Sequence, residues 1–181
     1  MPSPIVHVAL GTGAALTILP RTRRSLAGGL TLVALSCWPD IDYVPGLLAG
    51  SLNKFHQGLS HSLLFVLLGA LLAYPIARKT GFSSHTRTRT ISVLLLVALS
   101  HLLLDIFTQD FRPPIGIPLY WPLSDFPVHS SVSLFPAWAK ASLAEIIRSP
   151  QNLRAIGIEL LYAIPLLLLP PLLFRRRRPS R

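Results

Sequence analysis

Four apolar runs, each close to the length of a membrane crossing, constrain the fold of this chain more than any other feature. They cover residues 5–19, 63–77, 91–107 and 155–174, and a fifth, shorter run covers 26–38. A bilayer core about 30 Å thick takes about 20 apolar residues per helical crossing, and fewer where neighbouring helices help. With 51% hydrophobic and 13% charged residues, the chain is too apolar for an ordinary soluble domain of its size. The sequence therefore predicts a small integral membrane protein.

The predicted fold class is all-α: a polytopic membrane bundle of about five transmembrane helices in one domain, residues 1–181. A long extracytoplasmic loop, 109–154, joins the fourth and fifth helices, and a basic tail, 175–181, ends the chain. Whether 26–38 crosses fully is left open. No positive residue precedes the first run, which is followed instead by "RTRR", so we expect it to stay as a helix and not to be cleaved as a signal peptide.

The basic residues predict the orientation, because Lys and Arg concentrate in loops that stay cytoplasmic. With the N-terminus outside, residues 21–24, the loop 78–89 and the tail all lie inside, and they hold most of the 17 cations. The net charge of +10 suggests nucleic acid, but clusters at helix ends are more typical of orientation signals and anionic-lipid contact. We predict a multi-pass cell-membrane protein with a cytoplasmic C-terminus, whose partner is lipid and not nucleic acid. The oligomeric state is left open.

Histidines and carboxylates gather on one side of this topology. All seven acidic residues and every histidine except His85 fall in its outer half. Ionisable groups inside an apolar run are costly and usually face a cavity or a partner. The candidates near predicted helix ends are His7, Asp40, Asp42, His56, His61, His101 and Asp105. We interpret them as metal ligands brought to one depth by helices far apart in sequence; the single cysteine, Cys37, cannot build such a site alone.

The stretch "SHLLLDIF" places His101 and Asp105 four residues apart, so both project from one face of a helix. The pair fits a metal site and equally a buried His–Asp hydrogen bond. In "CWPDIDYVPG", Pro39 disfavours continuation of the preceding helix, so Asp40 and Asp42 are expected in extended chain with their carboxylates on one side. Two close anions favour a cation between them, although a solvated turn is the alternative.

The stretch "HQGLSHS" reads as a turn that leads into the third run. Gly58 supplies flexibility there, and Ser60 is expected to cap a helix that begins near His61. A single histidine at such a place is more often a hydrogen-bonded surface residue, and the same holds for His7. The coincidence of four such stretches at one predicted depth is what favours a shared site.

In these motifs the sequence resembles the YdjM-like family of LexA-binding, inner-membrane metal-dependent hydrolases. The resemblance covers roughly residues 4–125. It rests on the early His7, on "PDID", on "HQGLSHS", on "HLLLD" and on "GIPLYWPLS". Gln57 stands where that family usually has arginine. The resemblance implies a metal-dependent hydrolase of the cell inner membrane.

A divalent ion held by His and Asp with an open position activates water and polarises a phosphoryl or acyl oxygen. Seven candidate ligands exceed the four that one structural zinc needs, so we expect one or two ions, zinc first, with manganese or iron as alternatives. The candidate catalytic residues are Asp40, Asp42, His61 and Asp105, and which carboxylate acts as general base is left open. Because the site lies at the outer headgroup level, the predicted substrate is a phosphoester or a lipid-linked compound such as a phospholipid.

Two other functions fit the same residues. Intramembrane His and Asp also mark ion pathways, so the chain is alternatively a divalent-cation transporter or sensor. The family resemblance also allows a non-enzymatic regulatory membrane protein. Ligands in both halves of the membrane would favour transport, and the inner half offers only His85.

Overall fold

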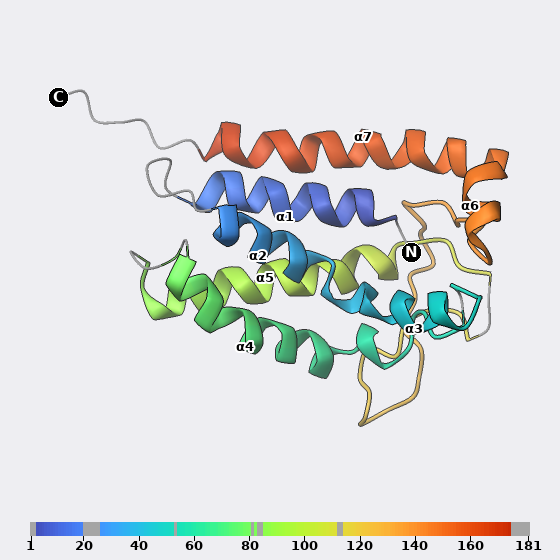
Figure 1. Ribbon diagram of the computed structural model, residues 1–181, viewed down its shortest axis with the longest axis horizontal. Helices are drawn as coiled ribbons and strands as arrows, with labels where there is room; N and C mark the ends of the chain where they lie inside the picture. The colour runs from blue at the N-terminus through green and yellow to red at the C-terminus, as the bar shows by residue number, and fades with distance from the viewer. Residues whose placement is uncertain are drawn as a thin grey trace.

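The computed structural model describes residues 3–19, 26–52, 54–80, 82, 85–111 and 114–174, and it is helical throughout (Figure 1). The α-helices are α1 (Pro4–Ile18), α2 (Leu26–Ser36), α3 (Tyr43–Leu48), α4 (Leu63–Thr80), α5 (Arg87–Ile106), α6 (Leu143–Arg148) and α7 (Pro150–Leu173). Two short 3-10 helices, η1 (Trp38–Asp42) and η2 (Leu59–His61), precede α3 and α4. The all-α prediction is confirmed.

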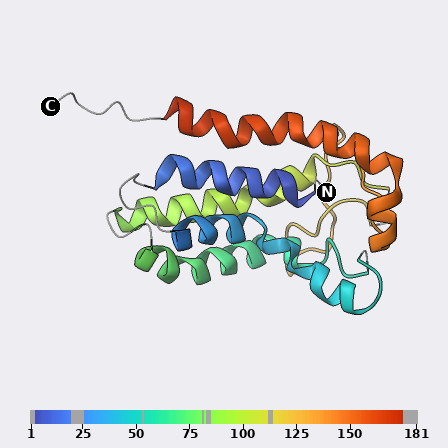
Figure 2. The same ribbon diagram turned by 45° about the horizontal axis from the view of Figure 1, so that its top comes forward.

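The five longer helices run roughly parallel to one axis and form a bundle (Figures 1 and 2). The start of α1, the end of α2, the start of α4, the end of α5 and the start of α7 lie at one end, on the right of Figure 1. The helices α3 and α6 and the loop after α5 lie at this end too. We call it the loop end. Successive long helices therefore run in opposite directions, as the predicted topology requires.

Hydropathy locates the longer helices to within a few residues. The runs 5–19, 63–77 and 91–107 correspond to α1, α4 and α5, and the short run 26–38 corresponds to α2. The largest difference is at α7, which begins at Pro150 inside the predicted loop 109–154. Proline suits the first turn of a helix, where its missing N–H costs no hydrogen bond. The predicted loop is thus shorter, and the tail 175–181 lies outside the described residues.

In the part of the chain that the structure describes, three helices are long and apolar enough to cross a membrane: α4, α5 and α7. Helices α1 and α2 are apolar but shorter, with 15 and 11 residues. Both run beside the long helices, α1 between α7 and α2. The prediction of a membrane helix bundle is confirmed, and full crossing by α1 and α2 stays a prediction.

Small residues let α1 approach its two neighbours closely. A Cβ on Gly13 would lie 2.2 Å from the backbone oxygen of Leu166 in α7. On the opposite side, a Cβ on Gly11 would lie 2.4 Å from the hydroxyl of Ser36 in α2. Such contacts are how helices associate where lipid removes the hydrophobic driving force. The stretch "GTG" at residues 11–13 therefore serves close helix packing, and its contacts fix α1 between α2 and α7.

The chain after α2 differs from the expected extended segment. Pro39 does follow the end of the α-helix, but residues 38–42 continue as the 3-10 helix η1. Proline is tolerated at the start of a helical turn, and the tighter 3-10 turn keeps the chain compact. Asp40 and Asp42 consequently point to different neighbours, as described below. The prediction of extended backbone here is wrong.

The turn before α4 is also arranged differently from the expectation. The helix begins at Leu63, and the Ser62 hydroxyl accepts a hydrogen bond from the Phe65 amide at 3.3 Å. Ser60 does not cap the helix, because its hydroxyl donates to Asp42 at 2.7 Å. The left-handed backbone conformation falls on Gln57, with φ of 63°, and not on Gly58.

The segment between α5 and α6 has no regular helix among its described residues, because its several prolines oppose helix formation. It pairs only locally, through isolated bridges of Thr108 with Phe135 and of Ile117 with Val128. It also reaches α4, since the Leu63 amide donates to the Leu119 carbonyl at 2.9 Å. The segment therefore covers the loop end of the bundle. Arg112, which also belongs to this segment, lies outside the described residues.

Candidate metal centre

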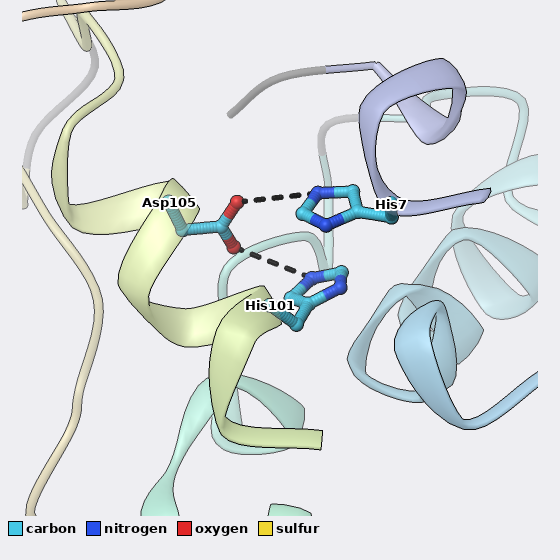
Figure 3. A group of neighbouring side chains, drawn as sticks. All are labelled: His7, His101 and Asp105. Carbon is cyan, nitrogen blue, oxygen red and sulfur yellow. Dashed lines mark ion pairs between the residues drawn. The ribbon is translucent and has the colours of Figure 1, made fainter. Parts of the chain in front are cut away.

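Two predicted ligands, His101 and Asp105, come from the last turns of α5, where both side chains are buried. Their spacing of four residues puts His101 Nε2 3.4 Å from Asp105 Oδ2. His7, from the first turns of α1, stacks on His101 with ring centroids 3.8 Å apart, and its Nε2 lies 3.7 Å from Asp105 Oδ1. Figure 3 shows both rings facing the carboxylate. Two helices thus contribute to one side of the site.

Two further predicted ligands reach the same point from η1 and η2. His61 Nε2 lies 3.2 Å from Asp105 Oδ2 and 4.0 Å from Asp40 Oδ1. Asp40 Oδ1 is also 3.8 Å from His101 Nε2. His61 is fully buried. The predicted convergence of distant segments is therefore present in the structure.

The atoms that face one another in this cluster have no hydrogen-bond partner in the described part of the chain. They are His61 Nε2, His101 Nε2, both nitrogens of His7, and both carboxylate oxygens of Asp40 and Asp105. Each unsatisfied buried polar group costs about 1–3 kcal/mol, so several together require an explanation. Ligand atoms about 2.0–2.2 Å from a tetrahedral ion lie roughly 3.3 Å apart, close to the separations seen here. The cluster of His7, Asp40, His61, His101 and Asp105 is hereafter the five-ligand cluster.

Two of these histidines are held by partners behind them. His101 Nδ1 lies 2.8 Å from the carbonyl oxygen of Ser36, and His61 Nδ1 lies 3.2 Å from Asp42 Oδ2. An Nδ1–H that donates to such an acceptor leaves Nε2 with its lone pair directed into the cluster. The outer contacts therefore set both rings in the tautomer that a metal ion needs.

Asp42 was predicted as a ligand, but protein donors occupy its oxygens. His56 Nδ1 lies 2.8 Å from Oδ1, while the Ser60 hydroxyl and the Gln57 amide donate to Oδ2 at 2.7 and 3.1 Å. With His61 on the same oxygen, the carboxylate orients the surrounding groups. Its role as a direct ligand stays a prediction, and this geometry favours the outer role instead.

His56 contacts the cluster through Asp42, whose Oδ1 lies 2.8 Å from its Nδ1. Its ring stacks on Tyr43 with centroids 4.0 Å apart, and its Nε2 has no hydrogen-bond partner among the described residues. One ligand atom each of His56, Asp40 and His61 lies within 4.8 Å of the others. A second group, formed by His7, His101 and Asp105, meets the same criterion. The donor set is therefore large enough for two ions, with Asp40 and His61 between the groups.

Burial and charge set the protonation of the groups in η1, in η2 and at His56. Burial raises the pKa of Asp40 to about 6 and lowers the pKa of His56 to about 3. Burial also opposes a charge on His61, but the carboxylates of Asp105 and Asp42 outweigh it and raise the pKa of His61 to about 9. His56 is therefore neutral at pH 7, ready to bind an ion, whereas His61 must lose a proton first.

Two groups near the cluster, Lys140 and the Ser36 carbonyl, carry no signal in the sequence. Lys140, from the loop before α6, donates from Nζ to the Tyr43 hydroxyl at 2.7 Å, and so lies behind His56. The Ser36 carbonyl is a backbone group and invisible to any motif. Ser60 lies within "HQGLSHS", where a hydroxyl beside a histidine could have indicated it. His129 is not part of the cluster: it lies in the loop after α5, and its Nε2 is 3.2 Å from the Thr108 carbonyl oxygen.

A cavity of about 270 Å³ opens at the loop end, between the chain that follows α5 and the segment around α6. Its walls include Gln109 and Asp110, which follow the ligand Asp105 in sequence, and Trp138 and Lys140 from the loop. Polar and aromatic groups thus line this cavity, and none of the candidate ligands is among its lining residues.

Replacing Asp42 by asparagine tests its outer role. The amide keeps the size of the side chain but removes the charge and offers a donor where His56, His61 and Ser60 also donate. We expect the affinity for zinc to fall about 10–100-fold, the usual effect of losing such a partner. Competition with a chromophoric chelator measures it, and Asp125→Asn, at an exposed position, is the matched control. Complete loss of metal would instead show that Asp42 is itself a ligand.

Comparison with known proteins places this arrangement in a family. The model of the YdjM inner membrane protein family matches residues 1–176. The chain is 31% identical over 191 residues to inner membrane protein YbcI of Escherichia coli (strain K12), covering 98% of this chain and 100% of that protein. No solved structure matches with significance. The chain therefore belongs to the YdjM inner membrane protein family.

Proposed function

We propose that this inner-membrane protein is a metal-dependent hydrolase that acts on a phosphoester or lipid-linked substrate. One observation carries the proposal: ligand atoms from α1, η1, η2 and α5 converge without hydrogen-bond partners among the described residues. Burying these polar and charged side chains costs free energy, and hydrogen bonds among the described residues do not offset that cost. A bound cation would compensate that cost.

The five-ligand cluster would hold the ion, and His56 with Asp40 and His61 would take a second. Imidazole nitrogen combined with carboxylate oxygen suits zinc, and manganese or iron as alternatives. When bound, such an ion supplies a Lewis acid and water of lowered pKa. The ligand count exceeds four, so at least one carboxylate remains available for another role.

The residues of the chain divide the remaining tasks. Asp42 and the Ser36 carbonyl hold the rings of His61 and His101. Asp40 is the best candidate for general base, because it lies between the two ligand groups and its Oδ2 has no hydrogen-bond partner within the described segments. A carboxylate oxygen that is not bound to the ion can accept a proton from water and release it to a leaving group. Asp105, which faces three imidazoles, is better placed as a permanent ligand.

The surroundings of the site support a substrate from the membrane. Apolar side chains stand exposed at the loop end, including Leu48, Leu123, Phe126 and Ile147. Apolar and aromatic groups at such a level suit the interface between headgroups and acyl chains. The Lys140 ammonium lies behind His56 and adds positive charge on the side of the cavity. We therefore favour a lipid phosphate over a cytoplasmic metabolite.

The orientation is part of the proposal. The positive-inside rule places the N-terminus and the loop end outside the cytoplasm, and the C-terminus inside. Labelling single cysteines added at the loop end and after α7 in intact cells tests this. We expect only the cysteine at the loop end to be labelled. If only the cysteine after α7 were labelled, the orientation would be the opposite of the proposed one, and the substrate would lie in the cytoplasmic leaflet.

The hydrolase is tested with purified protein stripped by chelator. We expect zinc, manganese or iron to restore cleavage of bis-p-nitrophenyl phosphate or of a fluorogenic phospholipid, because the ion activates the attacking water. Asp40→Asn should keep the ion held by His7, His61, His101 and Asp105 but lose most of the rate. If the protein bound metal but cleaved no phosphoester, and carried zinc into proteoliposomes, the proposed hydrolase would be rejected in favour of a transporter. Binding without cleavage or flux would leave a sensor.

A further inference from the structure

Glu159 is a buried carboxylate that the metal centre does not use. It lies in the apolar helix α7, and its side chain is fully buried. Its Oε1 accepts hydrogen bonds from the Ser3 amide at 2.8 Å and from the Trp138 indole N–H at 2.6 Å. Its Oε2 accepts from the Ser3 hydroxyl. A buried carboxyl group in such a place needs hydrogen-bond donors around it, and three donors surround this one.

The main partner of Glu159 is the first turn of α1. Ser3 is the N-cap of that helix, and its hydroxyl also accepts from the Ile5 amide at 3.2 Å. His7 follows four residues later, about one helical turn along the same helix. Any shift of the start of α1 along α7 would therefore move the His7 ring relative to Asp105.

His7 depends on its helix more than the other histidines of the five-ligand cluster do. His61 and His101 each have an acceptor behind Nδ1, whereas neither nitrogen of His7 has a hydrogen-bond partner in the described structure. Its ring is placed by stacking on His101 and by the position of the α1 backbone. A ligand without an outer partner of its own must be oriented by something else.

We propose that Glu159 is a positioning residue for His7: by holding the N-cap of α1, it sets the His7 ring in the metal centre. The inference rests on the proposed metal centre and extends it to α7, which contributes no ligand. The same face of α7 also secures the loop. Asn152, two turns earlier, accepts from the Ala139 amide at 2.9 Å and donates to the Ala139 carbonyl at 2.8 Å. Glu159 thereby joins the ligand helix to the loop that lines the cavity.

The test compares three variants with distinct effects on these bonds. Glu159→Ala removes all acceptors and should weaken zinc binding about 10–100-fold, the range for a lost orienting contact. Glu159→Gln keeps an acceptor for the Ser3 and Trp138 N–H groups and can donate to the Ser3 hydroxyl, so it should restore affinity to within about threefold. Trp138→Phe removes a donor from the loop but leaves α1 held, so its affinity should match the unsubstituted protein.

Two readouts separate positioning from general stability. In the cobalt-substituted protein, Glu159→Ala should change the visible absorption bands, because the His7 nitrogen is displaced. In the metal-free protein, hydrogen exchange should quicken at residues 5–8 and not at the end of α5. An unchanged cobalt spectrum with only a lower melting temperature would overturn the proposal, as would equal losses in Trp138→Phe.

Two further results keep the test decisive. Ser3→Ala removes only the hydroxyl donor and should show the same change at a smaller size, which serves if Glu159→Ala cannot be purified. Failure of the unsubstituted protein to bind any divalent metal would overturn the proposed function. The exchange measurement on metal-free protein would still show whether Glu159 holds α1, so the two failures are distinguishable.

Discussion

Purified Asp105→Ala protein should contain divalent metal only at background level. Asp105 is the one carboxylate that faces three imidazoles, with oxygens 3.7, 3.2 and 3.4 Å from the Nε2 atoms of His7, His61 and His101. Removing it leaves histidines in a buried site with far less negative charge to balance a dication. We expect an affinity loss of at least about 100-fold, since even an outer partner contributes 10–100-fold. His101→Ala should behave similarly.

Elemental analysis after dialysis measures this loss, with thermal unfolding as a second readout. Metal should raise the melting temperature of the unsubstituted protein, because it binds only the folded state, and should leave Asp105→Ala unchanged. Asp125→Ala, at an exposed position in the loop, is the matched control. Circular dichroism and gel filtration in detergent check that the variant stays folded. A folded Asp105→Ala protein with full metal content would refute the metal centre.

The second large effect is expected from a single methyl group between α1 and α7. In Gly13→Ala the new Cβ would lie 2.2 Å from the backbone oxygen of Leu166, and backbone cannot rotate away as a side chain can. The helices must separate, so the free energy of unfolding should fall by roughly 1–3 kcal/mol, toward the upper end of overpacking costs. His7 lies on the displaced helix, so zinc affinity should fall too.

Unfolding in mixed detergent micelles measures this change, and α7 supplies the control. A Cβ on Gly157 meets no atom within 4 Å, so Gly157→Ala should be neutral or gain up to about 1 kcal/mol from helix propensity. If Gly13→Ala were as stable as Gly157→Ala, α1 and α7 would not be in backbone contact.

Helix positions could be predicted because a membrane segment is defined by a continuous apolar run, which is visible in the sequence itself. The run 26–38 illustrates the limit: the hydropathy continues to Trp38, but the α-helix ends at Ser36 and a 3-10 turn takes over. The apolar character of a residue indicates that it avoids water and says nothing of its backbone geometry. It therefore could not distinguish the α-helix from the 3-10 turn. The same limit hid the true start of α7 at Pro150.

The convergence of the ligands could also be predicted, because alternating crossings bring helix ends to one side. The different roles of the individual residues could not be predicted. Asp40 and Asp42 are equivalent in "PDID", yet one faces the cluster and the other accepts hydrogen bonds from His56, Gln57 and Ser60. That difference arises from the pitch of η1, which turns successive carboxylates in different directions. Glu159 was equally hidden, since its partner Ser3 lies at the opposite end of the sequence.

The shortness of α2 has a consequence for how a substrate arrives. Eleven residues of helix span about 16 Å, roughly half the hydrocarbon thickness of a bilayer. At its end the Ser36 carbonyl contacts His101, so the ligands lie at the end of a helix whose described length is about half of a bilayer core. We expect the interface between water and lipid to lie deeper in the bilayer beside α2, so that a water-filled depression reaches the ligands. A phosphate could then descend to the ligands while its acyl chains remain among neighbouring lipids, without extraction of the substrate from the membrane.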